Sequence, residues 1–319
     1  MKLITILLIA LSFAAAPVQA NEQVRLGLIE AAFERWLKTN RANGVLSVRR
    51  KGVEKAVFSK GIPGNAQVEI ASLSKAITGV CAAQLIRSGK LRADQTVADA
   101  LGSGPDVTLA QLLTHTSGLR PDSTQGAMAK WLGSTRDRSL DVLAAIEKRR
   151  APKPGKYLYN NENYALAGLM IANAMNASYA QTCQTQALSP ASVRGAAGAQ
   201  SGGFQPWGGW AMTVSDYSKF HSYWFGGNRA TARKPTSYPH VNLGGGAGYG
   251  LGTFFRTGRN GSNFWHFGAY CMRSKFQMGT YAVTWGGDYT ITAYYDRCVK
   301  DSAMGALDAA MIDAVFGAL

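Results

Sequence analysis

The arrangement of strand-like and helix-like segments along the chain is the feature that most restricts its fold. Residues 44–61 hold two β-rich runs that meet at Lys51-Gly52, a pattern typical of a hairpin. Four more β-rich runs lie between about Tyr249 and Asp296 and are separated by turns that contain glycine and asparagine. Much of the chain between these regions has the apolar spacing of helices. The predicted order is a helix, a hairpin, a helical middle, a meander and a final helix.

This order predicts an α+β fold in which the two terminal parts share one antiparallel sheet, flanked by their helices. The helical middle is then an inserted, all-helical second lobe. We assign residues 21–75 and 225–319 to the sheet lobe and residues 76–224 to the helical lobe, with an active site at their interface. Helices are expected at residues 22–40, 74–88, 107–115, 138–149, 161–175 and 301–319.

The first twenty residues have the pattern of a secretory signal peptide. A short positive start is followed by an apolar run and by "VQA", a small-x-small ending. The apolar run is too short to favour a membrane span. We therefore expect cleavage after Ala20, a periplasmic or secreted mature chain, and no stable membrane span after cleavage. An uncleaved anchor is the alternative.

The charge balance and the cysteines limit the classes of function. The formal charge is +15, with the basic residues scattered rather than interleaved with aromatic residues in a stripe. For an exported chain this favours solubility and loose attraction to an anionic envelope over binding of nucleic acid. The sequence has no CxxC motif or His/Cys cluster, so we predict neither a metal nor another cofactor.

The four cysteines are too few and too dispersed for a disulfide scaffold, and three connectivities are possible. Cys81 lies in an apolar helical segment and is expected to be a buried free thiol. Cys271 and Cys298 lie in the strand-rich part and could form a bridge.

The segment "VEIASLSKAITG" (68–79) places Lys75 three residues after Ser72, in surroundings otherwise suited to burial. If Ser72 begins a helix, both side chains lie on one face. A lysine can take the serine proton only if burial lowers its pKa from about 10.4 toward neutrality. The alternative is that Ser72 caps the helix while Lys75 extends to water.

Two further segments make the first pattern more specific. Residues 154–171, "PGKYLYNNENYALAGLMI", place Tyr159 and Asn161 just before an apolar helix. Residues 263–270, "NFWHFGAY", place His266 and Gly268 on a strand. The order S-x-x-K, Y-x-N, H-x-G is a stronger signal than any one of the three.

With these three motifs the chain resembles the serine β-lactamase and penicillin-binding-protein superfamily, specifically its class C-like branch. That branch contains class C β-lactamases, D-alanyl-D-alanine carboxypeptidases and related esterases and amidases. Three flanking segments resemble the branch as well: "LAQLLTHTSGL" (109–119), "GGWAMTVSDYSKF" (208–220) and "YGLG" (249–252). The resemblance as a whole spans about residues 44–310.

The resemblance implies that Ser72 is acylated, that Lys75 activates it and that Tyr159 passes the proton to the leaving group. Whether Lys75 or Tyr159 is the base for acylation stays open. By the same resemblance, Asn161 binds the substrate amide carbonyl and His266 replaces the lysine of the K-T-G form of the third motif. The backbone N–H groups of Ser72 and Ala269, the residue after Gly268, form the oxyanion hole.

Each assignment has a structural alternative. Tyr159 could pack in the core, and His266 could be a buried structural histidine. Asn161 could be the helix N-cap, with Asn160 or Asn163 sharing that task. The resemblance makes His115 part of a structural turn. Lobe packing is favoured over a substrate platform for three aromatic residues, Phe204, Trp207 and Trp210.

The third motif departs from K-T-G, because Phe267 replaces a residue with a small or hydroxyl side chain. We expect Phe267 to remove a hydroxyl donor and to narrow the groove, and Arg273 is a candidate to bind a substrate carboxylate. By the resemblance, the histidine favours a peptide or ester substrate over a β-lactam antibiotic. The expected partner is a small-molecule or peptidoglycan-peptide substrate, with a D-alanyl peptide first. A small ester or amide is second and a β-lactam third. The alternative class is a penicillin- or peptidoglycan-binding relative without turnover.

Overall fold

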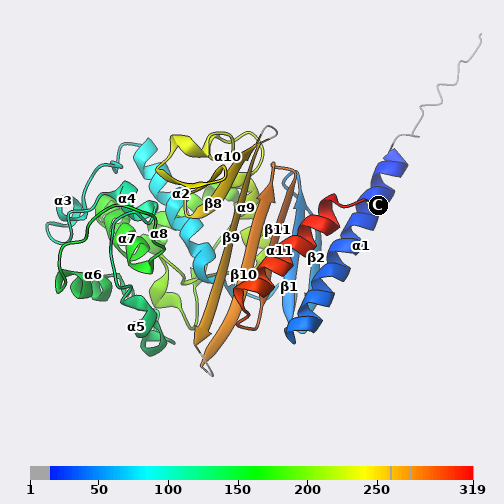
Figure 1. The fold of residues 1–319 in the computed structure, drawn as a ribbon, viewed down its shortest axis with the longest axis horizontal. Helices are drawn as coiled ribbons and strands as arrows, with labels where there is room; N and C mark the ends of the chain where they lie inside the picture. Colours follow the sequence, from blue (N-terminus) through cyan, green and yellow to red (C-terminus); the bar gives the residue numbers. More distant parts are fainter. Residues whose placement is uncertain (1–14, 259–260, 273–274, 319) are drawn as a thin grey trace, which may run out of the picture.

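The main sheet has eight antiparallel strands and joins the two ends of the chain, as Figure 1 shows. This computed structural model describes residues 15–258, 261–272 and 275–318, with side chains described from residue 21 onward. The strand order is β2-β1-β11-β10-β9-β8-β7-β6. The bounds are β1 Gly44–Arg50, β2 Val53–Lys60, β6 His240–Gly244, β7 Ala247–Gly250, β8 Thr253–Gly258, β9 Gly261–Met272, β10 Phe276–Trp285 and β11 Tyr289–Tyr295.

The predicted α+β class is confirmed, and the reason lies in how the terminal strands pair. β1 and β2 form the hairpin expected at Lys51-Gly52, where both residues have positive φ values of 48° and 81°. β1 then pairs with β11, from Gly44 opposite Tyr295 to Arg50 opposite Tyr289. The meander and the hairpin therefore lie in one sheet although about 190 residues separate them along the chain.

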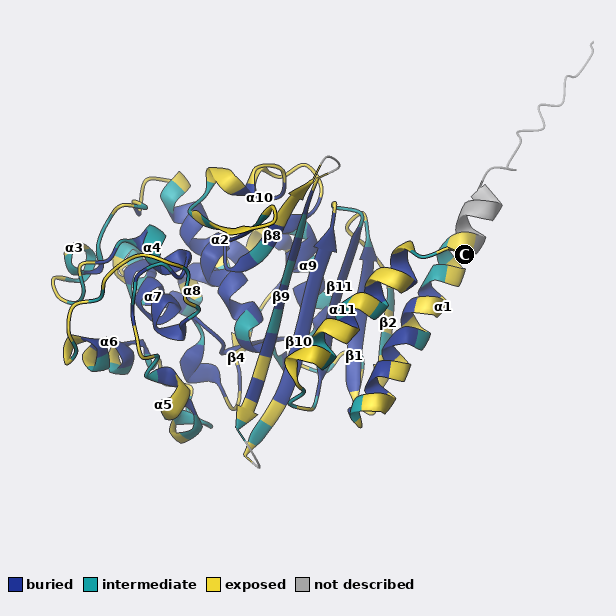
Figure 2. Ribbon diagram, in the orientation of Figure 1, coloured by how far each residue is buried: buried dark blue, intermediate teal, exposed yellow. Residues whose placement is uncertain are grey.

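The two terminal helices cover one face of this sheet. α1 (Ala15–Asn40) and α11 (Asp301–Phe316) lie side by side, and the Trp36 indole donates to the Ala303 carbonyl at 2.8 Å. Their inner side chains pack on alternate residues of β1, β10 and β11 to form one core cluster. Figure 2 shows the outcome, with buried strands beneath helices whose outer surface is exposed. The helix expected over residues 22–40 is therefore present but begins earlier.

The opposite face carries α9 (Val214–Phe225) and, beyond it, the other helices. α9 packs on β1, β10 and β11 although we expected residues 76–224 in the helical lobe. The lobe boundaries stay a prediction. The remaining helices are α2 Ser74–Arg87, α3 Val97–Leu101, α4 Leu109–Leu113, α5 Thr124–Trp131, α6 Ser139–Glu147, α7 Asn161–Met175, α8 Tyr179–Cys183 and α10 Ala230–Arg233. A small sheet contains β3 Val68–Glu69, β4 Ala196–Ala197 and β5 Trp210–Met212.

Two disulfides tie distant segments together. Cys271 pairs with Cys298, so that prediction is confirmed. Cys81 pairs with Cys183, so the prediction of a free thiol is wrong. Cys81 is buried as expected, but α8 brings a second cysteine against α2 from 102 residues further along the chain. An apolar helical pattern reports burial and carries no information about such a partner.

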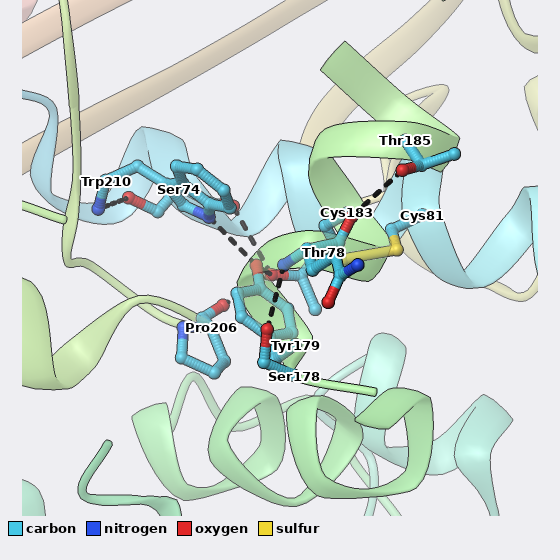
Figure 3. The surroundings of a disulfide bond; sticks show 10 residues. Ser74, Thr78, Cys81, Ser178, Tyr179, Cys183, Thr185, Pro206 and Trp210 are labelled. Atoms are coloured by element: carbon cyan, nitrogen blue, oxygen red, sulfur yellow. Dashed lines mark hydrogen bonds between the residues drawn. A yellow bond between two sulfur atoms is a disulfide. The ribbon is translucent and has the colours of Figure 1, made fainter. Parts of the chain in front are cut away.

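Figure 3 shows that the Cys81–Cys183 bridge lies in a buried polar network. The Thr78 hydroxyl is 2.6 Å from the Tyr179 hydroxyl and donates to the Pro206 carbonyl at 2.6 Å. The Trp210 indole also donates to the Tyr179 hydroxyl, at 3.0 Å. α2, which follows Ser72 and carries Lys75, is therefore held against the helical part by both a disulfide and hydrogen bonds.

Residues 1–14, most of the expected signal peptide, lie outside the described residues, and the cleavage after Ala20 stays a prediction. Within residues 15–258, 261–272 and 275–318, none of the helices combines the length and the apolar composition that crossing a membrane requires.

Candidate active site

Ser72 and Lys75 lie together at the start of α2. Ser72 belongs to the 3-10 turn η1 (Ala71–Leu73), which leads directly into α2, and Leu73 occupies the cap position of that helix. The Nζ of Lys75 is 3.1 Å from the Oγ of Ser72. Ser72 is partly exposed, whereas Lys75 is 0% exposed. The alternative in which Ser72 caps the helix and Lys75 extends to water is therefore wrong.

Burial changes the acid–base character of Lys75. Removal from water lowers its pKa from 10.5 to about 7, because the charged form loses its hydration. The Asp122 carboxylate acts in the opposite direction and raises the pKa. A substantial neutral fraction therefore exists near pH 7, and a neutral amine can accept a proton.

The three partners of Lys75 suit both the charged and the neutral amine. Its Nζ is 2.8 Å from the Oδ1 of Asn161 and 2.7 Å from the Trp207 carbonyl oxygen, and both of these oxygens only accept. A neutral amine has two N–H groups for these two acceptors. Its lone pair then remains for the hydroxyl of Ser72, to which the charged form donates instead.

Tyr159 approaches Ser72 from the loop before α7. Its hydroxyl donates to the Oγ of Ser72 at 2.8 Å, and its ring lies 4.8 Å from the Nζ of Lys75. Burial raises the pKa of Tyr159 well above its usual value, so the phenol is protonated at neutral pH. This geometry contradicts the alternative in which Tyr159 only packs in the core.

His115 supports the Tyr159 loop from behind. Its backbone carbonyl accepts from the Leu158 N–H at 2.8 Å, and its Nδ1 lies 3.3 Å from the Asn160 backbone nitrogen. Burial lowers the pKa of His115 well below 6.5, with Lys75 adding to the effect, so the ring is neutral. These contacts agree with the structural turn implied for His115.

Asn161 is the first residue of α7, and its neighbour Asn160 is the N-cap. The Oδ1 of Asn160 accepts from the Glu162 N–H at 2.7 Å. The alternative in which Asn161 caps the helix is therefore wrong, because Asn160 has the extended backbone of a cap residue. The Asn161 amide instead points to Lys75 on one side and donates to the Oγ1 of Thr124 on the other, at 3.0 Å.

His266 reaches the site from β9. Its ring centroid is 6.0 Å from that of Tyr159, and its Nδ1–H donates to the Phe267 carbonyl at 2.5 Å. Burial, and secondarily the charge of Lys75, lower the pKa of His266 to about 3. The side chain is therefore a neutral hydrogen-bonding group at neutral pH and does not replace the positive charge of a lysine.

Phe267 does not narrow the groove, so that expectation is wrong. Successive strand residues point to opposite faces, and Phe267 packs under the terminal helices, 5.2 Å from the ring of Tyr281. Arg273, the candidate for binding a carboxylate, lies outside the described residues.

Gly268 and Ala269 lie where β9 passes Ser72. β8 pairs with β9 from Gly258 opposite Gly261 to Phe254 opposite Trp265. Gly268 and Ala269 therefore lie beyond the end of that pairing. A Cβ on Gly268 would lie 2.9 Å from the backbone nitrogen of Ser72. This proximity brings the Ser72 N–H next to the strand whose Ala269 N–H is the second oxyanion candidate.

We expect Gly268→Ala to reduce both stability and the reactivity of Ser72. The added methyl would also lie 2.5 Å from the Oγ1 of Thr280, and neither neighbour is the flexible end of a long side chain. The free energy of unfolding should fall by about 1–3 kcal/mol. Urea denaturation measures this. Gly305→Ala is the control, because its Cβ meets nothing within 4 Å. Wild-type stability and reactivity in Gly268→Ala would contradict this close approach.

The aromatic residues 204–210 pack the lobe and form no platform. Phe204, Trp207 and Trp210 are at most 1% exposed, and the rings of Phe204 and Trp207 stack with centroids 5.6 Å apart. The packing prediction is confirmed. The contact of Trp207 with the site, in which its backbone carbonyl accepts a hydrogen bond from Lys75, was not identified from the sequence. No pattern of side chains could identify a backbone atom as a partner.

Two other residues near Lys75 were missed. Asp122 and Thr124 follow the "LLTHTSGL" segment, and Thr124 is buried next to Asn161. An aspartate two residues before a helix start was a usable signal, but it also fits an ordinary helix start. Among the described residues, no three or more His, Cys, Asp or Glu side chains are grouped as a metal site.

The matching family model, together with the antiparallel sheet, its helices and the serine, lysine and tyrosine beside it, places the chain in the serine β-lactamase and penicillin-binding-protein superfamily. The resemblance to this superfamily is thereby confirmed, and the class C-like branch stays a prediction. More narrowly, the chain belongs to the Beta-lactamase family, whose model matches residues 30–297.

Solved structures share the fold. A penicillin-binding protein homologue from Pyrococcus abyssi has a TM-score of 0.72 at 18% identity, covering 89% of this chain and 76% of that chain. A D-stereospecific amidohydrolase from Streptomyces has a TM-score of 0.68 at 18% identity, covering 91% of this chain and 98% of that chain.

A relative identified by sequence matches only part of the chain. "Protein flp" of Staphylococcus aureus strain MW2 is 32% identical over 136 residues, which is 40% of this chain and 27% of that relative.

Proposed function

We propose that this chain is a serine hydrolase that acts through an acyl-enzyme on Ser72. The observation that carries the proposal is the position of the Ser72 hydroxyl, 3.1 Å from the Nζ of buried Lys75 and 2.8 Å from the Tyr159 hydroxyl. A partly exposed hydroxyl between an amine with a lowered pKa and a protonated phenol is the arrangement of an activated nucleophile. The family membership supports the same reaction class.

In the proposed acylation, the amine of Lys75 takes the Ser72 proton while the Oγ bonds to the substrate carbonyl carbon. Lys75 is the better candidate for the base, because burial lowers its pKa to about 7 and raises the pKa of Tyr159 well above its usual value. The carbonyl oxygen becomes an oxyanion at the N–H groups of Ser72 and Ala269. The bond to the leaving group then breaks, and Tyr159 gives its proton to the leaving group. Tyr159 in turn receives the proton that Lys75 took from Ser72.

Deacylation reverses this sequence with water as the nucleophile. Water loses one proton to the Lys75–Tyr159 pair, its oxygen bonds to the acyl carbon, and the Oγ of Ser72 leaves and regains a proton. Asn161 binds the substrate amide carbonyl with the N–H of its amide that does not contact Thr124. His266 and Gly268 line the substrate side along β9.

The proposed substrate is a D-alanyl peptide of cell-wall type, followed by a small ester or amide. The neutral His266 in place of a lysine supports a peptide or ester over a β-lactam antibiotic. Likeness in fold to a D-stereospecific amidohydrolase supports the amide class. A binding relative without turnover is the other candidate. The main support for that candidate was the expectation that Phe267 blocks the substrate groove. The Phe267 side chain instead lies on the face of β9 opposite the site, against Tyr281.

We also propose that the chain is exported after removal of residues 1–20 and acts in the periplasm or outside the cell. Its two disulfides support this location, because structural disulfides persist in oxidising compartments. A peptidoglycan peptide would be met in the same compartment.

The proposal is tested by intact-protein mass spectrometry after incubation with a penicillin. We expect a covalent adduct on the wild type and none on Ser72→Ala, because the Oγ is the atom acylated. Ser88→Ala is the matched control, since Ser88 lies at the exposed end of α2 and should leave the adduct unchanged.

Three results are informative. A persistent adduct supports a peptidase-like enzyme with slow deacylation. Consumption of penicillin that depends on Ser72, without an adduct, favours the β-lactamase. If the wild type reacts with neither penicillin nor a fluorophosphonate, which labels activated serines of any specificity, the proposed nucleophile is wrong.

A further inference from the structure

A continuous line of hydrogen bonds leads from Lys75 away from Ser72. The Nζ of Lys75 donates to the Oδ1 of Asn161 at 2.8 Å, and the Nδ2 of Asn161 donates to the Oγ1 of Thr124 at 3.0 Å. The Thr124 hydroxyl then donates to the Oδ1 of Asp122 at 2.7 Å. Thr124 is 0% exposed and Asn161 is 5% exposed, so water does not replace these contacts.

The direction of this line follows from its last member. An ionised carboxylate has no proton to give, so the Thr124 hydroxyl must donate to Asp122. With its only proton committed, Thr124 can only accept from Asn161, which places the Nδ2 of the amide toward Thr124. The Oδ1 of Asn161 then faces Lys75.

We propose that Asp122, acting through the Thr124 hydroxyl, is a positioning residue that sets the orientation of the Asn161 amide and thereby the hydrogen bonding of Lys75. With the amide reversed, Nδ2 would face the Nζ of Lys75, and two donors would be opposed at 2.8 Å. Lys75 would lose one of its two acceptor oxygens, and its lone pair would no longer be directed only at Ser72. The effect on the Ser72 labelling rate rests on the proposed function, whereas the effect on the ionisation of Lys75 does not.

The orientation also determines what Asn161 offers a substrate. The Nδ2 has two N–H groups, of which one reaches Thr124. The other is free to donate to a carbonyl in the groove. A reversed amide would present an acceptor to that carbonyl, so the relay controls a proposed binding contact as well as the amine.

Asp122 has a second influence on Lys75 through its charge. Its carboxylate raises the pKa of Lys75 against the larger effect of burial. The other titratable side chains near Lys75 are Tyr159 and Tyr164, whose rings lie 4.8 and 5.8 Å from the Nζ, and two of the buried histidines, His115 and His266. His115 and His266 are neutral near pH 7, since Lys75 and burial lower the pKa of each.

The Asp122 carboxylate also accepts hydrogen bonds from backbone N–H groups. A test must separate this structural role from the relay through Thr124. Its Oδ1 accepts from the Thr124 N–H at 3.0 Å, and its Oδ2 accepts from the Asn161 N–H at 2.9 Å. In Asp122→Asn, the new side-chain NH₂ group would face one of these two backbone N–H donors. The substitution therefore also disturbs the loop that Asp122 holds. Thr124→Val removes only the hydroxyl and leaves the carboxylate and its backbone contacts in place, so it isolates the relay.

The experiment measures the ionisation of Lys75 directly and the reactivity of Ser72 separately. In protein labelled with [13Cε]lysine, the Lys75 signal is assigned by its loss in Lys75→Met and titrated by NMR. The rate of Ser72 labelling by a fluorophosphonate is measured in parallel. The variants are Thr124→Val, Thr124→Ser and Asp122→Asn. Ser123→Ala is the matched control, because that hydroxyl binds Glu162 and not the relay.

We expect Thr124→Val to lower the pKa of Lys75 and to slow Ser72 labelling roughly 10- to 100-fold, the range in which misplaced catalytic groups fall. Thr124→Ser should restore both quantities. Asp122→Asn should lower the pKa further, because the charge is lost as well. Ser123→Ala should match the wild type in titration and labelling.

The outcomes separate the relay from the proposed function. A Thr124→Val variant that titrates and reacts like the wild type overturns the relay, whatever Asp122→Asn does. A change in Asp122→Asn alone assigns the effect to charge or to loop structure and also overturns it. If the wild type is not labelled but the Lys75 titration shifts as expected, the relay stands and the acyl-enzyme proposal fails.

Discussion

Replacement of Lys75 by methionine is expected to slow the acylation of Ser72 by about 10²–10⁴-fold, the usual contribution of a positioned general base. Methionine has a similar length and fits a buried position, but it has no nitrogen to accept the Ser72 proton. The Nζ of Lys75 is 3.1 Å from the Oγ, so no other part of the side chain supplies this function. The rate of fluorophosphonate labelling measures the effect.

The wild type should also show a characteristic pH dependence. The pKa of Lys75 is lowered to about 7, and the neutral amine is the form that accepts a proton. The labelling rate should therefore be highest above pH 7 and fall about tenfold per unit as the pH decreases below 7. His266 and His115 do not account for this limb, because burial lowers the pKa of each well below that range.

Lys90→Met is the matched control. Lys90 follows α2 and is exposed, so the same substitution there should leave the rate and the pH profile unchanged. Circular dichroism of both variants shows whether they are folded. A folded Lys75→Met variant with the wild-type rate would assign the base to Tyr159 or to another group.

The second large effect concerns stability. Cys81→Ala/Cys183→Ala is expected to lower the free energy of unfolding by about 3–5 kcal/mol, since the bridge closes a loop of 102 residues. Both cysteines are 0% exposed, so alanine also leaves small gaps in the packing between α2 and α8. Urea denaturation measures the difference under oxidising conditions.

The second bridge provides the comparison. Cys271→Ala/Cys298→Ala opens a loop of 27 residues, and chain-entropy arguments give it about 1 kcal/mol less stabilisation than the longer loop. The prediction therefore includes a rank order as well as a size. If native Cys81 and Cys183 both react with iodoacetamide once the protein is unfolded without reductant, they are free thiols and the pairing is wrong.

Some features of the site were within reach of the sequence because they are local. The spacing of Ser72 and Lys75 places them one turn apart wherever that segment is helical. The Tyr159 and Asn161 positions directly precede a strongly apolar helix, and His266 and Gly268 alternate on a strand. Each motif depends on residues within a few positions of one another, where local geometry leaves little choice.

Other features required the packing of distant segments. Phe267 was misinterpreted because strand alternation was not applied to it: His266 and Gly268 face the site, so Phe267 between them faces away. The sequence does not show that the terminal helices cover that face. Asp122 was missed because its importance arises from Asn161, 39 residues away. The partner of Cys81 was missed for the same reason, as it comes from α8.

The sequence by itself determined the α+β order, the hairpin, the three motifs and their family. These depend on apolar periodicity, turn residues and short spacings, which act between near neighbours. Only the tertiary structure decided that Lys75 is fully buried, that a backbone carbonyl and a polar relay surround it, and that the terminal helices cover Phe267. The physical reason is that burial and electrostatics are set by every segment that closes over a residue, and most of those segments are distant in the chain.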